Sequence, residues 1–195
     1  MDEIEQAHAA VGGTGRGRRY ATQQVNQAYA VLLASQFQGF CRDLHSESVD
    51  HLVTTIAPPP GLLALVQTEF TRGRQIDRGN ARPSSIGADI GRLGIGFWTE
   101  VNRHHPNNAA RKTFLETLND WRSAIDRQDF DPSKLGGKTT LRLIQVRRWR
   151  VACHLLARAF DEVLRLHLEA IRDALNGRDS RARGNAPGPR RTPWD

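Results

Sequence analysis

Apolar residues recur every three or four positions along most of the chain, which is the spacing of one face of an α-helix. From about Tyr20 to Ile56 this spacing predicts a long helix, which Pro58 ends because proline lacks the amide hydrogen that a helix needs. No stretch shows the alternation of apolar and polar residues that is typical of a half-buried strand. The pattern therefore predicts an all-α protein, most simply a helical bundle.

The same spacing predicts four more helices, separated by segments rich in glycine, proline and asparagine. The last of them is long, is capped by Thr139 or Thr140, and is stopped by Asn176-Gly177. Glycines weaken the second of the four and permit the close approach of another backbone. The four helices are expected over residues 61–71, 86–103, 108–126 and about 140–175.

The two ends of the chain differ in composition from the helical part. Residues 1–19 include Gly12-Gly-Thr-Gly-Arg-Gly-Arg-Arg19, and we expect a flexible basic segment there after a short helical start. This glycine run lacks the Gly-Lys-Ser/Thr ending of a Walker A loop, and no cofactor is expected. Residues 177–195 are rich in arginine, glycine and proline, which predicts a disordered basic tail. The helical domain then spans residues 20–176.

The charge of the chain is strongly positive, at +7 over 195 residues. Lysine occurs only at positions 112, 134 and 138, so arginine supplies 25 of the 28 basic residues. Arginine suits bidentate contacts with phosphate, so this composition permits nucleic-acid binding. A GC-rich genome produces the same bias with no function attached, and composition alone leaves both explanations open.

The lack of an apolar span or a secretory signal, together with the two cysteines, predicts a cytoplasmic protein. No segment approaches the roughly 20 apolar residues of a membrane span, and the acidic N-terminus resembles no secretory signal. Cys41 and Cys153 match no metal spacing and are expected to be buried small apolar residues in a reducing compartment.

His104 and His105 have no further ligand at a suitable spacing, so we expect an exposed turn there and no metal site.

The most informative stretch is Leu118-Asn-Asp-Trp-Arg-Ser-Ala-Ile-Asp-Arg-Gln-Asp-Phe130, which contains Arg122 and Arg127. It resembles the signature of HEPN domains, small α-helical modules of many prokaryotic ribonucleases and toxins, often read as Arg-Asn-x-Ile-x-His. Arg122 stands at the family arginine, Ser123 replaces the asparagine, and Arg127 occupies the position of the histidine. The larger RiboL-PSP type of HEPN protein is similar over roughly residues 20–175, including Asn26–Leu33, Asp77–Asn80 and Phe114–Asn119.

The resemblance implies a homodimer whose motif helices form a shared RNA-binding groove. It also implies metal-independent cleavage, in which a histidine moves protons and an arginine stabilises the charged phosphate. Because arginine stays protonated above about pH 12, Arg127 cannot act as a general base. We therefore expect an RNA-binding protein that cleaves weakly or not at all, with Arg122 and Arg127 contacting RNA. The family context suggests defence or a toxin–antitoxin system, with an antitoxin or nucleotidyltransferase as a further partner.

Three alternatives stay open on the sequence. Arg122 and Arg127 are solvated charges paired with Asp126 or Glu116 if the helix has no binding role. The protein is an active endoribonuclease if His154, beside the core face of the last helix, replaces the missing histidine. Finally, the motif helix serves only dimerisation in a helical interaction module that binds no nucleic acid.

Overall fold

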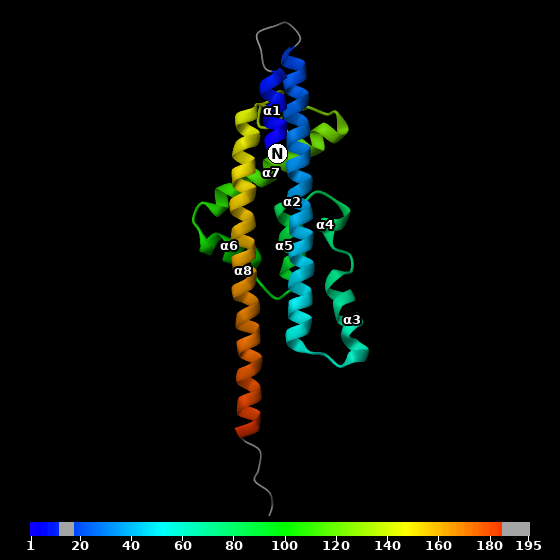
Figure 1. The fold of residues 1–195 in the computed structure, drawn as a ribbon, viewed down its shortest axis with the longest axis vertical. Helices are drawn as coiled ribbons and strands as arrows, with labels where there is room; N and C mark the ends of the chain where they lie inside the picture. The colour runs from blue at the N-terminus through cyan, green and yellow to red at the C-terminus, as the bar shows by residue number, and fades with distance from the viewer. Residues whose placement is uncertain (12–17, 185–195) are drawn as a thin grey trace, which may run out of the picture.

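The computed structural model describes residues 1–11 and 18–184, and these residues form eight α-helices and no strand (Figure 1). The prediction of an all-α bundle with a long C-terminal helix is confirmed. The helices are α1 (Asp2–Val11), α2 (Arg18–Ile56), α3 (Pro60–Thr71), α4 (Gln75–Arg78), α5 (Pro83–Gly91), α6 (Phe97–His104), α7 (Asn108–Arg127) and α8 (Leu143–Gly184).

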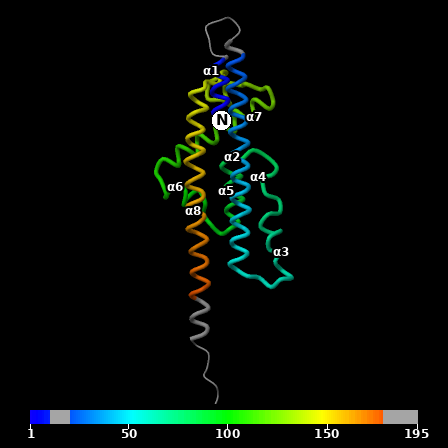
Figure 2. Tube along the Cα trace, in the orientation of Figure 1, coloured from blue at the N-terminus to red at the C-terminus, as the bar shows by residue number. Residues whose placement is uncertain are grey.

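Two long helices, α2 and α8, run side by side in the same direction along the longest axis of the molecule (Figures 1 and 2). α7 packs against both of them, and the pair α4 and α5 lies beside α2. α6 packs against α5, α7 and α8, while α1 lies against the first half of α2. Among the described helices, α3 packs only against α2 and contributes no buried residue.

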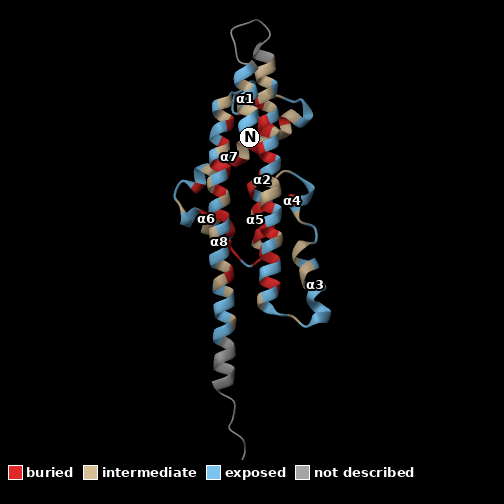
Figure 3. Ribbon diagram, viewed as in Figure 1, coloured by how far each residue is buried: buried red, intermediate tan, exposed pale blue. Residues whose placement is uncertain are grey.

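Aromatic residues from the three longest packed helices fill the core. Tyr29 of α2, Trp121 of α7, and Trp149 and Phe160 of α8 are almost completely buried. Figure 3 shows the buried residues along the facing sides of these helices. Burial of such large apolar surfaces is the main favourable contribution to folding.

The predicted helix over residues 86–103 is two helices in the structure, and this prediction is wrong. α5 begins at Pro83 and ends at Gly91, and α6 begins at Phe97. Gly94 between them has a φ of +82°, which glycine adopts without strain. The glycines that were expected only to weaken one helix therefore separate two.

The final helix also differs from its predicted limits. α8 begins at Leu143, after the expected caps at Thr139 and Thr140, and continues through Asn176-Gly177 to Gly184. Asparagine and glycine are weak helix formers, but neither forbids a helical backbone as proline does. Residues 185–195 of the predicted disordered tail, and 12–17 of the predicted flexible segment, lie outside the described residues.

Several apolar residues remain exposed despite their helical spacing. Phe114 of α7 and Ile144 of α8 follow the apolar spacing of their helices, yet they are 41% and 56% exposed. Leu62, Leu63 and Leu65 of α3 are also exposed. Both cysteines are buried and free, as predicted. Across the described chain, no helix combines the length and the apolar character needed to cross a membrane.

Candidate nucleic-acid interface

The two motif arginines point to different sides of α7. Five residues correspond to about 140° around an α-helix, so Arg122 and Arg127 cannot share one face. The side chain of Arg122 is only 19% exposed, because it turns toward α2. Arg127 is exposed in the last turn, where the free carbonyl groups of the helix favour a positive charge.

Arg122 belongs to a hydrogen-bond network that connects three parts of the fold. Its Nη1 donates to the side-chain oxygen of Gln38 on α2, at 2.7 Å. The amide of Gln38 donates in turn to the carbonyl oxygens of Ile76 (2.6 Å) and Gly79 (2.7 Å). Its Nε lies 3.9 Å from a carboxylate oxygen of Asp126, which is a weak ion pair. Gln38 therefore connects Arg122 of α7 to α4 and to the residue that follows it.

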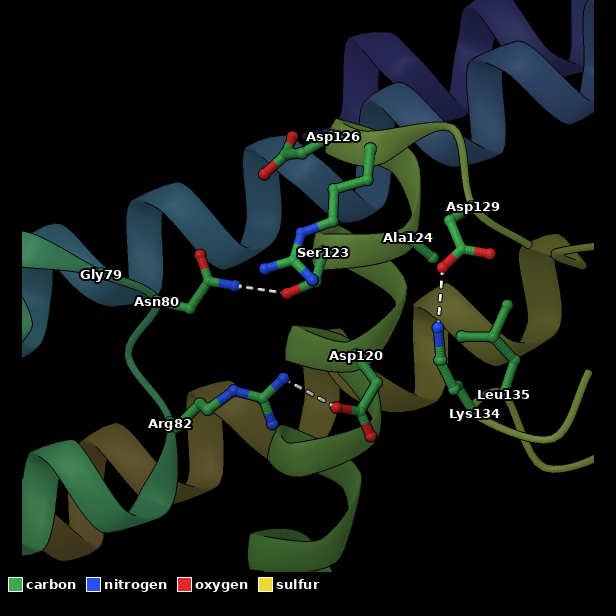
Figure 4. A pocket seen from close by; sticks show the side chains of 11 residues that line it. Gly79, Asn80, Arg82, Asp120, Ser123, Ala124, Asp126, Asp129, Lys134 and Leu135 are labelled. Atoms are coloured by element: carbon green, nitrogen blue, oxygen red, sulfur yellow. Dashed lines mark hydrogen bonds and ion pairs between the residues drawn. The ribbon is translucent and has the colours of Figure 1, made fainter. Parts of the chain in front are cut away.

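Beside this network lies a polar cavity of about 530 Å³ at the C-terminal end of α7 (Figure 4). Its walls come from the segment before α5, from α7, and from the loop that follows α7. The hydroxyl of Ser123 accepts a hydrogen bond from the side-chain amide of Asn80, at 2.8 Å. The lining residues are Gly79, Asn80, Arg82, Asp120, Ser123, Ala124, Asp126, Arg127, Asp129, Lys134 and Leu135.

Two of the three cations that line this cavity are already neutralised. Arg82 donates to Glu116 and Asp120, both at 2.8 Å, and Lys134 donates to Asp129 at 2.8 Å. The hydrogen bond that Lys134 donates to Asp129 raises the pKa of Lys134.

The third cation is Arg127, which makes no hydrogen bond or ion pair with any described residue. It is the guanidinium group at the cavity that remains available for a ligand. Glu116, expected as a possible partner of the motif arginines, pairs with Arg82 instead.

No histidine of the described chain lines this cavity. His154 is exposed on α8 and lines a separate groove, which shares no lining residue with the Arg127 cavity. His104 is exposed, but it is the last residue of α6 rather than part of a turn, and His105 after it is half-buried. Among the described residues, no three histidine, cysteine or carboxylate side chains are arranged to hold a metal ion.

Sequence reasoning missed the contribution of Asn80 and Arg82 to the cavity. Both precede α5, about 40 residues before their partners on α7, and no local spacing indicates that these segments meet. The Asp77–Asn80 segment was noted only for its resemblance to HEPN proteins. The signal that could have found Arg82 is charge complementarity, since Glu116 and Asp120 lie one turn apart on the same helix face.

Comparison of the chain with protein-family models, with curated protein sequences and with solved structures finds no match. The likeness to HEPN domains therefore rests on the motif residues and their order along the chain.

Proposed function

We propose that this protein binds RNA at the cavity beside the C-terminal end of α7, and that it cleaves RNA weakly or not at all, as a relative of the HEPN ribonucleases. The observation that carries the proposal is the state of Arg127. This residue is exposed, has no partner among the described residues, and lines a polar cavity. It also occupies the position where the HEPN motif has its proton-transferring histidine.

The chemistry around Arg127 suits a phosphodiester. A guanidinium group presents several donors in one plane and can bind two phosphate oxygens at once. Asn80 and Ser123 add an amide and a hydroxyl within the same cavity, which are groups that can bond to ribose or base edges. The net charge of +7 attracts RNA to the molecule before any specific contact forms.

The lack of a histidine among the described residues that line the cavity supports the non-cleaving part of the proposal. Histidine is the side chain whose ordinary pKa lies closest to neutral pH, and none lines the cavity among the described residues. The alternative of an endoribonuclease that uses His154 would require a second active site in the groove on α8. Such an enzyme would not need Arg127.

A direct test is to incubate purified protein with a fluorescently labelled single-stranded RNA in the presence of a metal chelator. We expect saturable binding by fluorescence anisotropy and intact RNA on a denaturing gel. Absence of binding would contradict the proposal, as would robust cleavage that disappears in Arg122→Ala. Cleavage that survives Arg127→Ala and disappears in His154→Ala would support the enzyme alternative.

A second observation favours self-association. An apolar groove of about 580 Å³ lies between α7 and α8, and its lining includes Phe114, Ile144 and Val151, which are 41%, 56% and 58% exposed. We propose that a second copy of the chain covers this groove and that the resulting homodimer doubles the number of available arginines. An antitoxin or nucleotidyltransferase partner in a defence system is the alternative occupant, and it would make the protein an interaction module.

A further inference from the structure

Two carboxylates of the N-terminal helix α1 bond to side chains of α2 and α8. Glu5 accepts hydrogen bonds from Nε (3.0 Å) and Nη2 (2.8 Å) of Arg147 and from the hydroxyl of Tyr29 (2.8 Å). Its second oxygen also lies 3.5 Å from Nη1 of Arg150, which donates to Asp2 at 2.8 Å. The hydrogen bonds from Arg147 and then Tyr29 lower the pKa of Glu5, so its carboxyl group is charged near neutral pH.

The groups that hold Glu5 form a site for an oxyanion. Arg147 and Arg150 lie three residues apart on α8, so their guanidinium groups lie near one another on one side of the helix. The ring of Tyr29 is buried in the core, which fixes its hydroxyl group between them. Two arginines and a phenol are the donors that a phosphate group requires, and the carboxylate oxygens of α1 stand in for phosphate oxygens here.

The apolar attachment of α1 is weak by comparison. None of the residues 1–10 is buried, and the apolar residues among them that pack against the core, Met1 and Ile4, are only partly buried. The ion pairs of α1 are partly exposed, and such pairs contribute little stability and weaken with salt. α1 can therefore be displaced at a small cost in free energy.

A groove adjoins the two arginines and gives the site room for more than an inorganic anion. With α1 in place it has a volume of about 740 Å³, and Glu5 of α1 forms part of its wall. Leu33, Phe37 and Phe40 contribute to its apolar lining. Arg147 and Arg150 also line it. A ligand that fits this combination carries phosphate at one end and a flat or apolar group at the other, as a nucleotide does.

We infer that Arg147, Arg150 and Tyr29 form a phosphate-binding site that α1 occupies with its own carboxylates, so that α1 and a phosphate ester compete for it. The site lines a groove separate from the Arg127 cavity. The inference does not rest on RNA binding at the Arg127 cavity, and either can fail alone. Arg147 and Val151 also line the groove between α7 and α8 that is proposed for self-association. In the structure described here, the site is in its self-occupied state.

The test compares two single substitutions on α1 in the full-length protein. Glu5→Gln removes the charge that Arg147 and Arg150 bind, while Glu3→Gln removes the same charge from an exposed residue that contacts neither arginine. We expect Glu5→Gln to bind pyrophosphate and adenosine monophosphate about fivefold more tightly than wild type, because α1 competes less well. Glu3→Gln should bind both as wild type does.

The arginines provide the reverse test. Arg147→Gln and Arg150→Gln, added to Glu5→Gln, should abolish the gain, whereas Arg158→Gln, at an exposed arginine of α8 that does not line the groove, should leave it unchanged. A Glu5→Gln protein that binds no more tightly than Glu3→Gln would overturn the inference, and so would a gain that survives loss of both arginines. If adenosine monophosphate binds no more tightly than pyrophosphate, the apolar groove has no part in recognition, and that part of the inference is wrong.

Wild-type protein gives a measurement that does not depend on how the variants fold. Pyrophosphate at saturating concentration should accelerate amide hydrogen exchange in residues 2–11, because the ligand displaces α1 from the arginines. Exchange in α3, which lies away from the site, serves as the internal control. An unchanged exchange rate in α1 with bound pyrophosphate would show that no competition takes place.

Discussion

Arg122 and Arg127 differ in what their guanidinium groups contact, and this difference decides what each can do. Arg122 is mostly buried and bonded to Gln38, so its substitution would loosen the segment after α4 as well as change the charge of α7. Arg127 is exposed and makes no hydrogen bond or ion pair with a described residue that its loss would break. A loss of RNA binding in Arg127→Ala can therefore be attributed to a lost contact with RNA. The same loss in Arg122→Ala could come from a lost contact or from the loosened segment after α4.

The first prediction concerns proton transfer at residue 127. Arg127→His places a group with a pKa near 6.5 where the HEPN motif has its histidine, and general acid–base catalysis contributes roughly a hundredfold or more. We expect this variant to cleave single-stranded RNA at least about tenfold faster than wild type, in the presence of a chelator, on a denaturing gel. Arg158→His should cleave no faster than wild type. Arg158 is an exposed arginine of α8 without a hydrogen-bond or ion-pair partner among the described residues. Equal rates in both variants would mean that position 127 is not part of a latent active site.

The second prediction concerns His45, which is completely buried between α2 and the α4–α5 segment. Nε2 of His45 donates to the carbonyl oxygen of Asp89, which leaves Nδ1 to accept from Arg74 at 3.4 Å. Burial, and then the charge of Arg74, lower the pKa of His45, so the folded protein keeps this ring neutral. The unfolded chain takes up the proton as the pH falls below about 6.5, and stability is lost in that direction.

We therefore expect the free energy of unfolding in urea to fall between pH 7.5 and pH 5.5, by at most about 1.4 kcal/mol per pH unit from this one proton. His45→Gln keeps a donor for the Asp89 carbonyl and cannot be protonated, so its stability should depend less on pH. His51→Gln, at an exposed histidine of the same helix, should behave as wild type. Identical pH dependence in wild type and His45→Gln would contradict the neutral buried ring.

At the scale of helices, the contact between α5 and α6 depends on the absence of one side chain. A Cβ atom at Gly87 would lie 2.8 Å from Cδ1 of Trp98, whose indole nitrogen donates to the carbonyl of Pro83 at 2.7 Å. We expect Gly87→Ala to destabilise the fold by about 1–3 kcal/mol, because the indole must move. Gly91→Ala, where a Cβ meets nothing within 4 Å, should leave stability unchanged or raise it slightly. Denaturant unfolding measures the free energy of unfolding of both variants. An equal loss of stability in Gly87→Ala and Gly91→Ala would contradict the close contact at Gly87.

Helices could be predicted from the sequence where a single apolar face continues over many turns. α3 and α7 were predicted to within one residue at each end, because proline and asparagine segments bound them. The break between α5 and α6 could not be predicted, since a glycine interrupts a helix only where packing requires a positive φ, as at Gly94. Helical spacing also cannot distinguish a face that packs within the chain from one left exposed, so it does not indicate that Phe114 and Ile144 are exposed.

The candidate site was predicted less completely than the fold. The motif located the helix that carries Arg122 and Arg127, but it did not indicate that Arg122 turns inward toward Gln38, 84 residues earlier in the chain. Pairing across such a distance is fixed by tertiary packing, which single-sequence patterns do not contain. The acidic start of α1 and the Arg147–Arg150 cluster were similarly visible as charges but not as partners.

At the scale of the whole molecule, the apolar groove between α7 and α8 predicts self-association. Val151→Asp places a charge in that groove, at a side chain that is 58% exposed and so is not needed for the core of one chain. We expect light scattering to give a dimer for wild type at micromolar concentration and a monomer for Val151→Asp. Leu65→Asp on α3 removes an equally exposed apolar residue elsewhere and should remain dimeric. If the wild type is monomeric, and remains so after RNA is added, the proposed dimer is wrong.

The most direct test of RNA binding at the α7 cavity is the salt dependence of the association constant for single-stranded RNA. The measurement compares wild type with Arg127→Ala and Arg158→Ala, each shown by circular dichroism to be folded. Each lost phosphate contact should lower the slope of the logarithmic plot by about 0.7, so Arg127→Ala should bind more weakly and with a shallower slope, while Arg158→Ala matches wild type. Equal slopes and affinities for wild type and Arg127→Ala would contradict the account and place RNA binding elsewhere on the molecule.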